Sequence, residues 1–317
     1  MKKRVIIIDA LNAYLRSYIV NPSLSINGDP IGGLKGFMGS LQVLCRQMKP
    51  DKIVIAWDGP GGSQRRKAIN KGYKEGRNPI RPNRSVRLLS EEEELRNKVW
   101  QQTRLIEYLN HVPVSQIMLE GIEADDIIAH ACNILKGWEK VIISSDKDFI
   151  QCCNEETVLY RPIQKKVMNK KTIVEQYGIH PTNFALARAI AGDKSDNLPG
   201  VPRAGLKTIA RRFPFLKENK HMFDRVFKHC KTVDSNVRIY KDVLDNKKLV
   251  ESNYKLMQLY APSLSPQSKR KISEAVNDML PEFNKTGILS MMSKDGFGIY
   301  DFTDLFSTFR KIVVDSK

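Results

Sequence analysis

Short apolar runs rich in β-branched residues recur through the first half of the chain. They cover residues 5–8, 53–57, 112–119 and 141–143. Runs of this length are typical of buried strands, and the sequence between them has the periodicity of helices. Because strands that alternate with helices form parallel sheets, we expect an α/β fold with a mostly parallel central sheet flanked by helices.

The pattern changes in two places. Between residue 59 and about residue 94 no apolar period is visible, which indicates a long insertion, either a functional loop or a disordered segment, placed at about residues 60–100. A helix is expected to begin at the acidic run of residues 91–94. From Lys170 onward the sequence reads as helices without a convincing strand. The predicted division is an α/β core over residues 1–190, carrying the insertion, and a helical region over residues 191–317.

Acidic residues follow the predicted strands or begin the helices after them. They are Asp9, Asp58, Glu123, Asp125, Asp126, Asp146 and Asp148. A later segment, residues 192–200, adds Asp193 and Asp196. In open α/β sheets ligands bind outside the carboxyl ends of the strands, where acids from distant parts of the sequence meet. The acids therefore occupy the positions expected of a site.

Each acidic segment also has an ordinary structural explanation. Asp146 and Asp148 fit a solvated turn, the acids at 123–126 fit a helix start, and Asp193 and Asp196 fit a turn before Pro-Gly. A site is favoured because nine such acids occur in a chain with 52 Lys and Arg against 35 Asp and Glu. Clustered carboxylates repel one another, and two divalent cations would neutralise them, as in two-metal phosphoryl hydrolysis.

The net charge of +17 predicts a polyanionic partner, either nucleic acid or an anionic membrane surface. No apolar run approaches the roughly 18 residues that span a bilayer, and the N-terminus lacks a signal-peptide pattern. The five cysteines form no Cys-x-x-Cys pair, and the five histidines show no ligand spacing. A reducing cytoplasm and oxygen ligands for Mg²⁺ or Mn²⁺ are therefore expected, rather than disulfides or zinc.

The insertion is strongly basic. Between residues 65 and 87 there are nine Lys or Arg residues and a single acid, Glu75. Such a segment is typical of phosphate binding, the ordinary alternative being a solvated basic face. Tyr73 next to Lys74 would let a base stack while its phosphate is held. The nucleic-acid contacts expected here are Arg65, Arg66, Lys67, Tyr73, Arg81, Arg84 and Arg87.

Six segments occur in the order of one known family. They are Ile8-Asp9, Trp57-Asp58-Gly59, Tyr73-Lys74-x-x-Arg77, residues 121–126, residues 144–148 and residues 191–201. In these segments the chain resembles the 5′ nucleases. That family includes the 5′-3′ exonuclease domain of bacterial DNA polymerase I, bacteriophage 5′ exonucleases with phage RNase H, and flap endonucleases. The resemblance covers roughly residues 1–215.

The resemblance implies two metal regions and a catalytic pair of cations. Asp9, Asp58, Glu123, Asp125 and Asp126 would serve one Mg²⁺, and Asp146, Asp148, Asp193 and Asp196 the other, with Glu123 and Asp125 between them. Mn²⁺ would substitute for Mg²⁺. Lys74 and Arg77 would contact the scissile phosphate at the base of a helical arch, which is the basic insertion.

The resemblance also implies a helix-hairpin-helix element at about residues 198–213. Its expected contacts with duplex backbone are Gly200, Arg203, Gly205 and Lys207. The family usually carries Gly-x-Gly in this hairpin, whereas this chain reads Arg203-Ala204-Gly205. That departure weakens the further expectation of a monovalent cation held by the hairpin.

The sequence thus predicts a metal-dependent structure-specific 5′ nuclease, a 5′-3′ exonuclease or flap endonuclease that removes RNA primers or 5′ flaps in DNA replication. It would be of the phage type, a monomer in the cytoplasm (of the host, if the chain is from a phage) that does not bind membranes. Expected partners are branched or nicked DNA and RNA–DNA hybrids, with a sliding clamp or single-strand-binding protein as further candidates. Two alternatives are a non-catalytic DNA-junction-binding protein on the same fold and a PIN-type ribonuclease.

The segment 301–306 has two interpretations. It suits a peptide that docks on a partner such as a sliding clamp, and it also suits an amphipathic helix packed on the domain. The helix is favoured.

Overall fold

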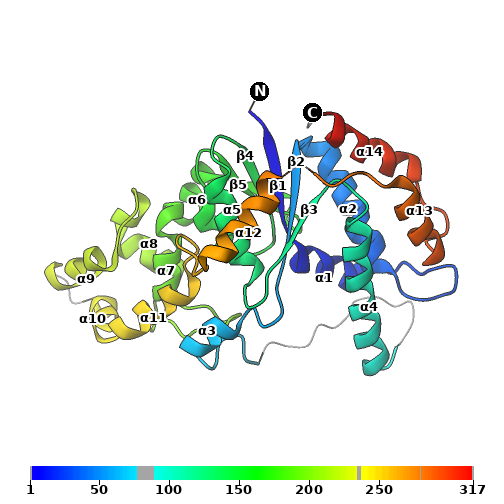
Figure 1. Ribbon diagram of the computed structural model, residues 1–317. Coiled ribbons are helices and arrows are strands. Elements are labelled where there is room, and N and C mark those ends of the chain that lie inside the picture. The colour runs from blue at the N-terminus through cyan, green and yellow to red at the C-terminus, as the bar shows by residue number, and fades with distance from the viewer. Residues whose placement is uncertain (1, 77–88, 234–236, 279, 316–317) are drawn as a thin grey trace.

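The computed structural model describes residues 2–76, 89–233, 237–278 and 280–315, and its centre is a six-stranded sheet (Figure 1). The strand order is β3-β2-β1-β4-β5-β6. The strands are β1 (Arg4–Asp9), β2 (Lys52–Trp57), β3 (Ser115–Met118), β4 (Glu139–Ile143), β5 (Thr157–Arg161) and β6 (Lys166–Met168). All neighbours pair in parallel except β5 and β6, which confirms the mostly parallel sheet.

The strands β5 and β6 were not predicted. Thr157–Arg161 alternates buried and half-buried residues, and Lys166–Met168 exposes two of its three residues. The apolar part of β5, residues 158–160, has a single β-branched member, and β6 has only two apolar residues, so neither gives the β-branched run by which the central strands were recognised. The short antiparallel β6 forms one edge of the sheet.

Two hydrophobic cores lie on the two faces of the sheet. Along β1, Val5 and Ile7 belong to one core, whereas Ile6 and Ile8 belong to the other, because successive side chains of a strand point to opposite faces. The first core includes α5 (Ala124–Ile134) and α7 (Phe184–Ala191). The second includes α1 (Ala10–Val20), α2 (Gly32–Met48) and α4 (Glu91–Leu109).

The helix α4 begins where the acidic run predicted it. The Ser90 side chain accepts a hydrogen bond from the Glu93 backbone, and the Glu93 side chain accepts one from the Ser90 backbone. This reciprocal cap satisfies two backbone N–H groups that would otherwise have no partner. The insertion therefore ends on a well-defined helix start.

Helices dominate the second half, as predicted. Besides α7, those described after residue 169 are α6 (Lys170–Tyr177), α8 (Leu206–Arg212), α9 (Phe223–Thr232), α10 (Arg238–Asp245), α11 (Lys247–Met257), α12 (Pro266–Asn277), α13 (Lys285–Lys294) and α14 (Phe302–Asp315). Short 3₁₀ turns cover η1 (Asp148–Cys152), η2 (Pro181–Asn183) and η3 (Pro214–Lys217), and the short α3 (Gln64–Ile69) lies in the insertion. Within the described ranges, no helix combines the length and apolar character needed to cross a membrane.

The segment 301–306 forms the start of α14 and packs on the domain. Leu305, Phe309 and Ile312 are buried in the second core, and α14 lies against α2 (Figure 1). Leu305 is buried and Phe302 and Phe306 are half-buried, so the apolar side chains of this segment are covered by the domain. This agrees with the amphipathic-helix interpretation.

Candidate active site

The carboxyl ends of three neighbouring strands bring the first acids to one edge of the sheet. Asp9 ends β1, Asp58 directly follows β2, and Asp146 follows β4. The register pairs Asp9 with Ala56 and Ile8 with Ile143, so the three strands end at nearly the same height. The fold therefore brings these three acids together at one edge of the sheet, as the sequence predicted.

Asp9 is buried between hydrogen-bond donors and other acids. Its side chain caps α1 by accepting from the backbone N–H of Asn12, and it accepts from the Ser144 hydroxyl at 2.8 Å. Burial raises the pKa of Asp9 from its ordinary 3.8 to about 7, the Ser144 hydrogen bond lowers it, and the nearby Asp58 and Asp146 raise it further. Protonation or a bound cation would offset the cost of burying this negative charge beside other acids.

The N-terminus of α5 carries the next acids to the same place. Asp58 accepts a hydrogen bond from the backbone N–H of Ala124 at 2.8 Å, which fixes the start of the helix against β2. Burial raises the pKa of Asp125 well above 3.8, and Asp146 and Asp9 raise it further. Asp9, Asp125 and Asp146 thus act on one another electrostatically, and they are called the central group below.

Glu123 and Asp126, called the clamped pair, each bind cationic side chains. Arg66 donates to both Asp126 oxygens at 3.0 Å and also to a Glu123 oxygen. Lys74 donates to the other Glu123 oxygen at 2.7 Å. Both carboxylates are largely buried, with side chains 4% and 14% exposed.

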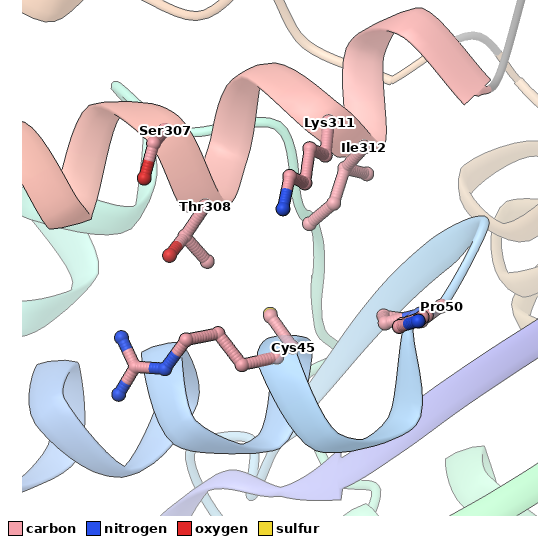
Figure 2. A pocket seen from close by; sticks show the side chains of 8 residues that line it. Cys45, Pro50, Ser307, Thr308, Lys311 and Ile312 are labelled. Carbon is pink, nitrogen blue, oxygen red and sulfur yellow. The ribbon is translucent and has the colours of Figure 1, made fainter.

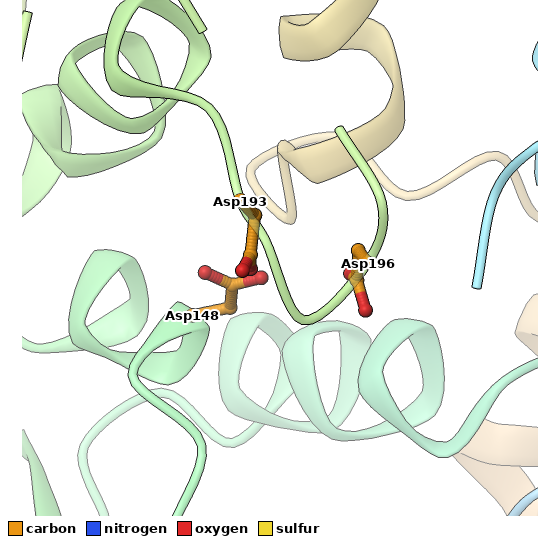
Figure 3. A group of neighbouring side chains, drawn as sticks. All are labelled: Asp148, Asp193 and Asp196. Atoms are coloured by element: carbon orange, nitrogen blue, oxygen red, sulfur yellow. The ribbon is translucent and has the colours of Figure 1, made fainter. Parts of the chain in front are cut away.

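Asp148, Asp193 and Asp196, called the loop group, form a third set (Figure 3). One carboxylate oxygen from each lies within 4.8 Å of the others. Arg188 on α7 contacts Asp193 and lies 3.2 Å from Asp148. Burial, followed by the charge of Asp146, raises the pKa of Asp148 to about 7, whereas Arg188 lowers it.

Two glycines close the loop that holds Asp193 and Asp196. A Cβ on Gly200 would lie 2.0 Å from the Ala191 carbonyl oxygen, and one on Gly192 would lie 2.3 Å from the Gly200 nitrogen. Gly192 also has a φ of +76°, which disfavours other residues. The Gly-Asp and Pro-Gly ends of the motif therefore bring the two sides of the loop into contact, as a backbone–backbone pair between Asp193 and Leu198 confirms.

The start of the basic insertion is anchored to this loop. The Lys74 backbone N–H donates to the Asp196 carbonyl at 3.0 Å, and the Asn197 side chain donates to the Gly72 carbonyl at 2.9 Å. Lys74 has a φ of +58°, a left-handed conformation that is strained for a residue with a side chain. These contacts hold the Lys74 side chain beside Glu123.

Tyr73 does not have the role predicted for it. Its ring is 3% exposed and packs in a small cluster with Leu198, Leu256 and Met257. A ring buried in this way has no free face for a nucleobase, because apolar side chains cover it. The stacking role is therefore corrected to an anchor for the base of the insertion.

The role predicted for Arg66 is also corrected. This residue was predicted to contact nucleic acid, but its side chain is only 11% exposed and binds Glu123 and Asp126. Its neighbours Arg65 and Lys67 are exposed on α3, and Arg65 donates to the Ser263 carbonyl. The predicted contacts at Arg77, Arg81, Arg84 and Arg87 lie outside the described residues.

The predicted helix-hairpin-helix segment, residues 198–213, contains the helix α8 after a turn at Pro202 and Arg203. Arg203 has a φ of +63° where the motif ordinarily has glycine, and its guanidinium donates to Asp242 at 2.9 Å. Gly205 is the residue before α8, and Lys207 is exposed in its first turn. The left-handed turn is thus formed without the first glycine of the motif.

A cavity of about 570 Å³ lies elsewhere, between α2 and α14 (Figure 2). Its lining includes Cys45, Lys49, Pro50, Thr308 and Lys311 and has no acidic residue or histidine. Because Lys49 and Pro50 lead into β2, the cavity lies at the amino ends of the strands, away from the acids. It is therefore not the metal centre.

The donor set of the acid site fits hard divalent cations. The converging groups are carboxylates, and histidines and thiols are absent from the described cluster of three that is close enough to share an ion. Oxygen ligands are those that Mg²⁺ and Mn²⁺ prefer. The buried acids with raised pKa values also require positive charge to stay ionised at neutral pH.

Two side chains of the site were missed by the sequence analysis. Arg188 is the one charged residue in the otherwise apolar helix Phe184–Ala191, a position where a buried cation needs an acid nearby. Ser144 directly follows the β4 run and reaches Asp9 from the neighbouring strand. The lone charge of Arg188 was a usable signal, whereas Ser144 gave none.

Comparison with known proteins identifies the fold and its relatives. Residues 4–178 match the model of the 5′-3′ exonuclease N-terminal resolvase-like domain. A 5′-3′ exonuclease of Buchnera aphidicola (subspecies Acyrthosiphon pisum) is 33% identical over 64% of this chain and 68% of its own. One from Aquifex aeolicus is 28% identical over 89% of this chain and 96% of its own. The flap endonuclease of bacteriophage T5, solved with DNA and metal ions, superposes with a TM-score of 0.65 at 16% identity over 92% of this chain and 99% of its own.

Proposed function

The chain belongs to the 5′-3′ exonuclease family, and from this premise we propose that it is a Mg²⁺-dependent, structure-specific 5′ nuclease. Its substrates would be phosphodiester bonds near the 5′ ends of flaps, nicked duplexes and RNA–DNA hybrids, as in primer removal during replication. One observation carries the proposal. The clamped pair, the central group and the loop group converge beside Lys74, at the start of a strongly basic insertion.

The carboxylates of this site are suited to hold divalent cations. Held by the central group and the loop group, they would neutralise the carboxylates and stabilise the charge that develops during phosphodiester hydrolysis. The presence of two sets of acids, one around Asp125 and one around Asp193, supports a count of two cations.

The chain's own residues would orient the nucleic acid. The strained backbone of Lys74 and its bond to Asp196 place the ammonium group next to the acids, where it would bind the scissile phosphate. Arg65 and Lys67 are exposed on α3 and would bind neighbouring phosphates of the same strand. Lys207 at the start of α8 would hold duplex backbone at a distance from the cut, with support from the helix N-terminus and Gly205.

A non-catalytic junction binder on the same fold is the alternative. It would have no need to retain buried acids whose mutual repulsion destabilises the fold. All nine predicted acids are present, and burial raises the pKa of Asp9, Asp125 and Asp148. Groups held in such costly states are typical of functional sites, so the nuclease is favoured.

The test is cleavage of three 5′-labelled substrates, a flap, a nicked duplex and an RNA–DNA hybrid, each with Mg²⁺ and with EDTA. We expect short 5′ fragments that appear only with Mg²⁺, and the ranking of substrates would show which activity dominates. Tight binding without cleavage in Mg²⁺ and in Mn²⁺ would instead establish the junction binder.

A further inference from the structure

Arg66 occupies an unusual place for a residue of a basic insertion. Its Nε donates to the Leu256 carbonyl at 2.9 Å, Nη2 donates to Asp126 at 3.0 Å, and Nη1 donates to both Asp126 and Glu123. The guanidinium thus joins α3, the start of α5 and the end of α11. Each of its three nitrogens is engaged, and the side chain is 11% exposed.

The charges around Arg66 balance without any added ion. Glu123 and Asp126 supply two negative charges, and Arg66 and Lys74 supply two positive ones at ion-pair distance. Arg66 binds both oxygens of Asp126 in the planar bidentate geometry that a guanidinium favours. The oxygens of Asp126 therefore already have strong partners.

Helix geometry separates Asp126 from its neighbour Asp125. Consecutive residues of an α-helix point about 100° apart, so the two side chains face different surroundings. Asp125 lies near the acids Asp146 and Asp9 and also feels the charges of Lys74 and Arg66, whereas Asp126 binds Arg66 directly through both carboxylate oxygens. One of these adjacent acids is available to a cation in the central group, and the other is not.

We propose that Arg66 is a positioning residue of the nuclease site, which holds Asp126 out of the metal centre and fixes Glu123 beside Lys74. It acts on the reaction through these side chains and makes no contact with the nucleic acid. The kinetic part of this inference rests on the proposed nuclease function. The ion-binding part does not, because it concerns the protein without substrate.

The first experiment measures Mn²⁺ binding to the full chain without nucleic acid, by electron paramagnetic resonance of the free ion. Asp126→Asn should change the dissociation constant by less than about twofold, whereas Asp125→Asn should raise it about tenfold or more, since loss of a ligand is the larger effect. An equal or larger loss of affinity in Asp126→Asn would make Asp126 a ligand and overturn the proposal.

The second experiment compares Arg66→Gln with the double variant Arg66→Gln/Asp126→Asn. The single variant leaves two acids facing one remaining cation, and we expect kcat to fall about 100-fold with KM for a flap substrate changed less than about threefold. The double variant removes one negative charge together with its partner. Its kcat should be about tenfold higher than that of Arg66→Gln, because the effects of two directly coupled residues are not additive.

A direct contact of Arg66 with phosphate predicts the opposite pattern. Arg66→Gln would then weaken binding to DNA and reduce the slope of log affinity against log salt by about one phosphate contact. Asp126→Asn would give no rescue. That combination would overturn the proposal and restore the role first expected from the sequence.

Two further variants keep the result decisive. Arg66→Lys retains the charge but lacks the bidentate fork, so kcat should lie between wild type and Arg66→Gln. Arg270→Gln/Glu274→Gln removes an exposed ion pair of α12, 72% and 57% exposed, and should leave kcat and Mn²⁺ binding unchanged. Circular dichroism shows whether Arg66→Gln folds. If it does not, Mn²⁺ binding to Asp126→Asn and the kinetics of Arg66→Lys test the proposal in its place.

Failure of the proposed function gives a different result from failure of this inference. If the wild-type chain cuts no substrate, the nuclease proposal is wrong. The Mn²⁺ affinities of the Asp125 and Asp126 variants would still show whether Arg66 keeps Asp126 away from the metal centre.

Discussion

The clamped pair and the central group are neighbours within one site, yet their charges are balanced in different ways. Glu123 and Asp126 are bound by Arg66 and Lys74. For the central group the described residues offer no such ion pair, and the pKa of Asp9 rises through burial to about 7. Removing a buried charge's partner costs about 3–5 kcal/mol, so buried acids need either an internal cation or an external one.

The difference separates structural acids from acids kept for a ligand. An acid with an internal cation has its charge balanced and its side chain held in place by the protein itself. An acid without one takes up a proton or a metal cation, and its state then depends on pH and on the ions in solution. The loop group is intermediate, because Arg188 binds Asp193 and lies near Asp148.

The largest effect is expected where one acid of the central group and one acid of the loop group are removed together. Asp146→Asn together with Asp148→Asn should abolish cleavage, a loss of at least about 10³-fold, while binding to flap DNA changes little. The basic surface remains intact in this variant, so affinity measured by fluorescence anisotropy should persist. Equal losses of binding and cleavage would contradict the separation of roles.

Lys74→Ala changes the clamped pair instead, because it removes one of the two cations that bind it. We expect turnover to fall by about 10²-fold with a small change in affinity, since one phosphate contact among many contributes little to binding. Single-turnover cleavage and a binding titration on the same flap measure the two effects. An unchanged rate would remove Lys74 from the catalytic residues.

The pH dependence of the metal-free protein should reflect the central group and the loop group. Burial is the main cause that raises the pKa of Asp9 and Asp148 from 3.8 to about 7. Between these values the folded chain binds more protons than the unfolded chain, so their contribution to stability is present below about pH 4 and is lost as pH rises to about 7.

Added Mg²⁺ should reverse that loss, because it binds the ionised acids. Thermal unfolding with and without MgCl₂ should therefore show a larger rise of Tm at pH 8 than at pH 5.5. An equal rise at both values would mean that these acids are not the ones that bind the cation.

The smallest effect is expected in the loop group, whose charge is partly balanced by Arg188. Arg188→Gln removes the internal cation of the loop group, and the affinity for Mn²⁺ should rise by about three- to tenfold, since a positive charge within a few ångströms opposes cation binding. Titration of the metal-free protein measures the change. A weaker affinity would show that Arg188 organises the loop more than it competes with the ion.

Much of this arrangement was predictable from the sequence. The β-branched runs of β1, β2 and β4 are buried on both faces and therefore continuous, and the acids after them had to meet because parallel strands end at one edge. The acidic start of α4 carried its own capping signal in Ser90 and Glu93. These features depend on neighbours in the sequence or on a regular sheet.

The partners of single charges were not predictable. Arg66 and Tyr73 lie in a basic segment and were assigned to nucleic acid, but the chain folds back so that they meet α5 and the end of α11. Similarly, β5 and β6 are recognised only by their pairing with β4 and with each other. No local pattern encodes which distant residue a guanidinium or a ring will contact.

The sequence by itself thus determined the α/β fold, the edge of the sheet at which the acids meet and the family to which the chain belongs. Only the tertiary structure decided which of those acids bind a cation of the protein and which do not. The physical reason is that strand and helix patterns follow from local periodicity, whereas the neutralisation of a buried charge depends on the few ångströms that separate residues far apart in the sequence.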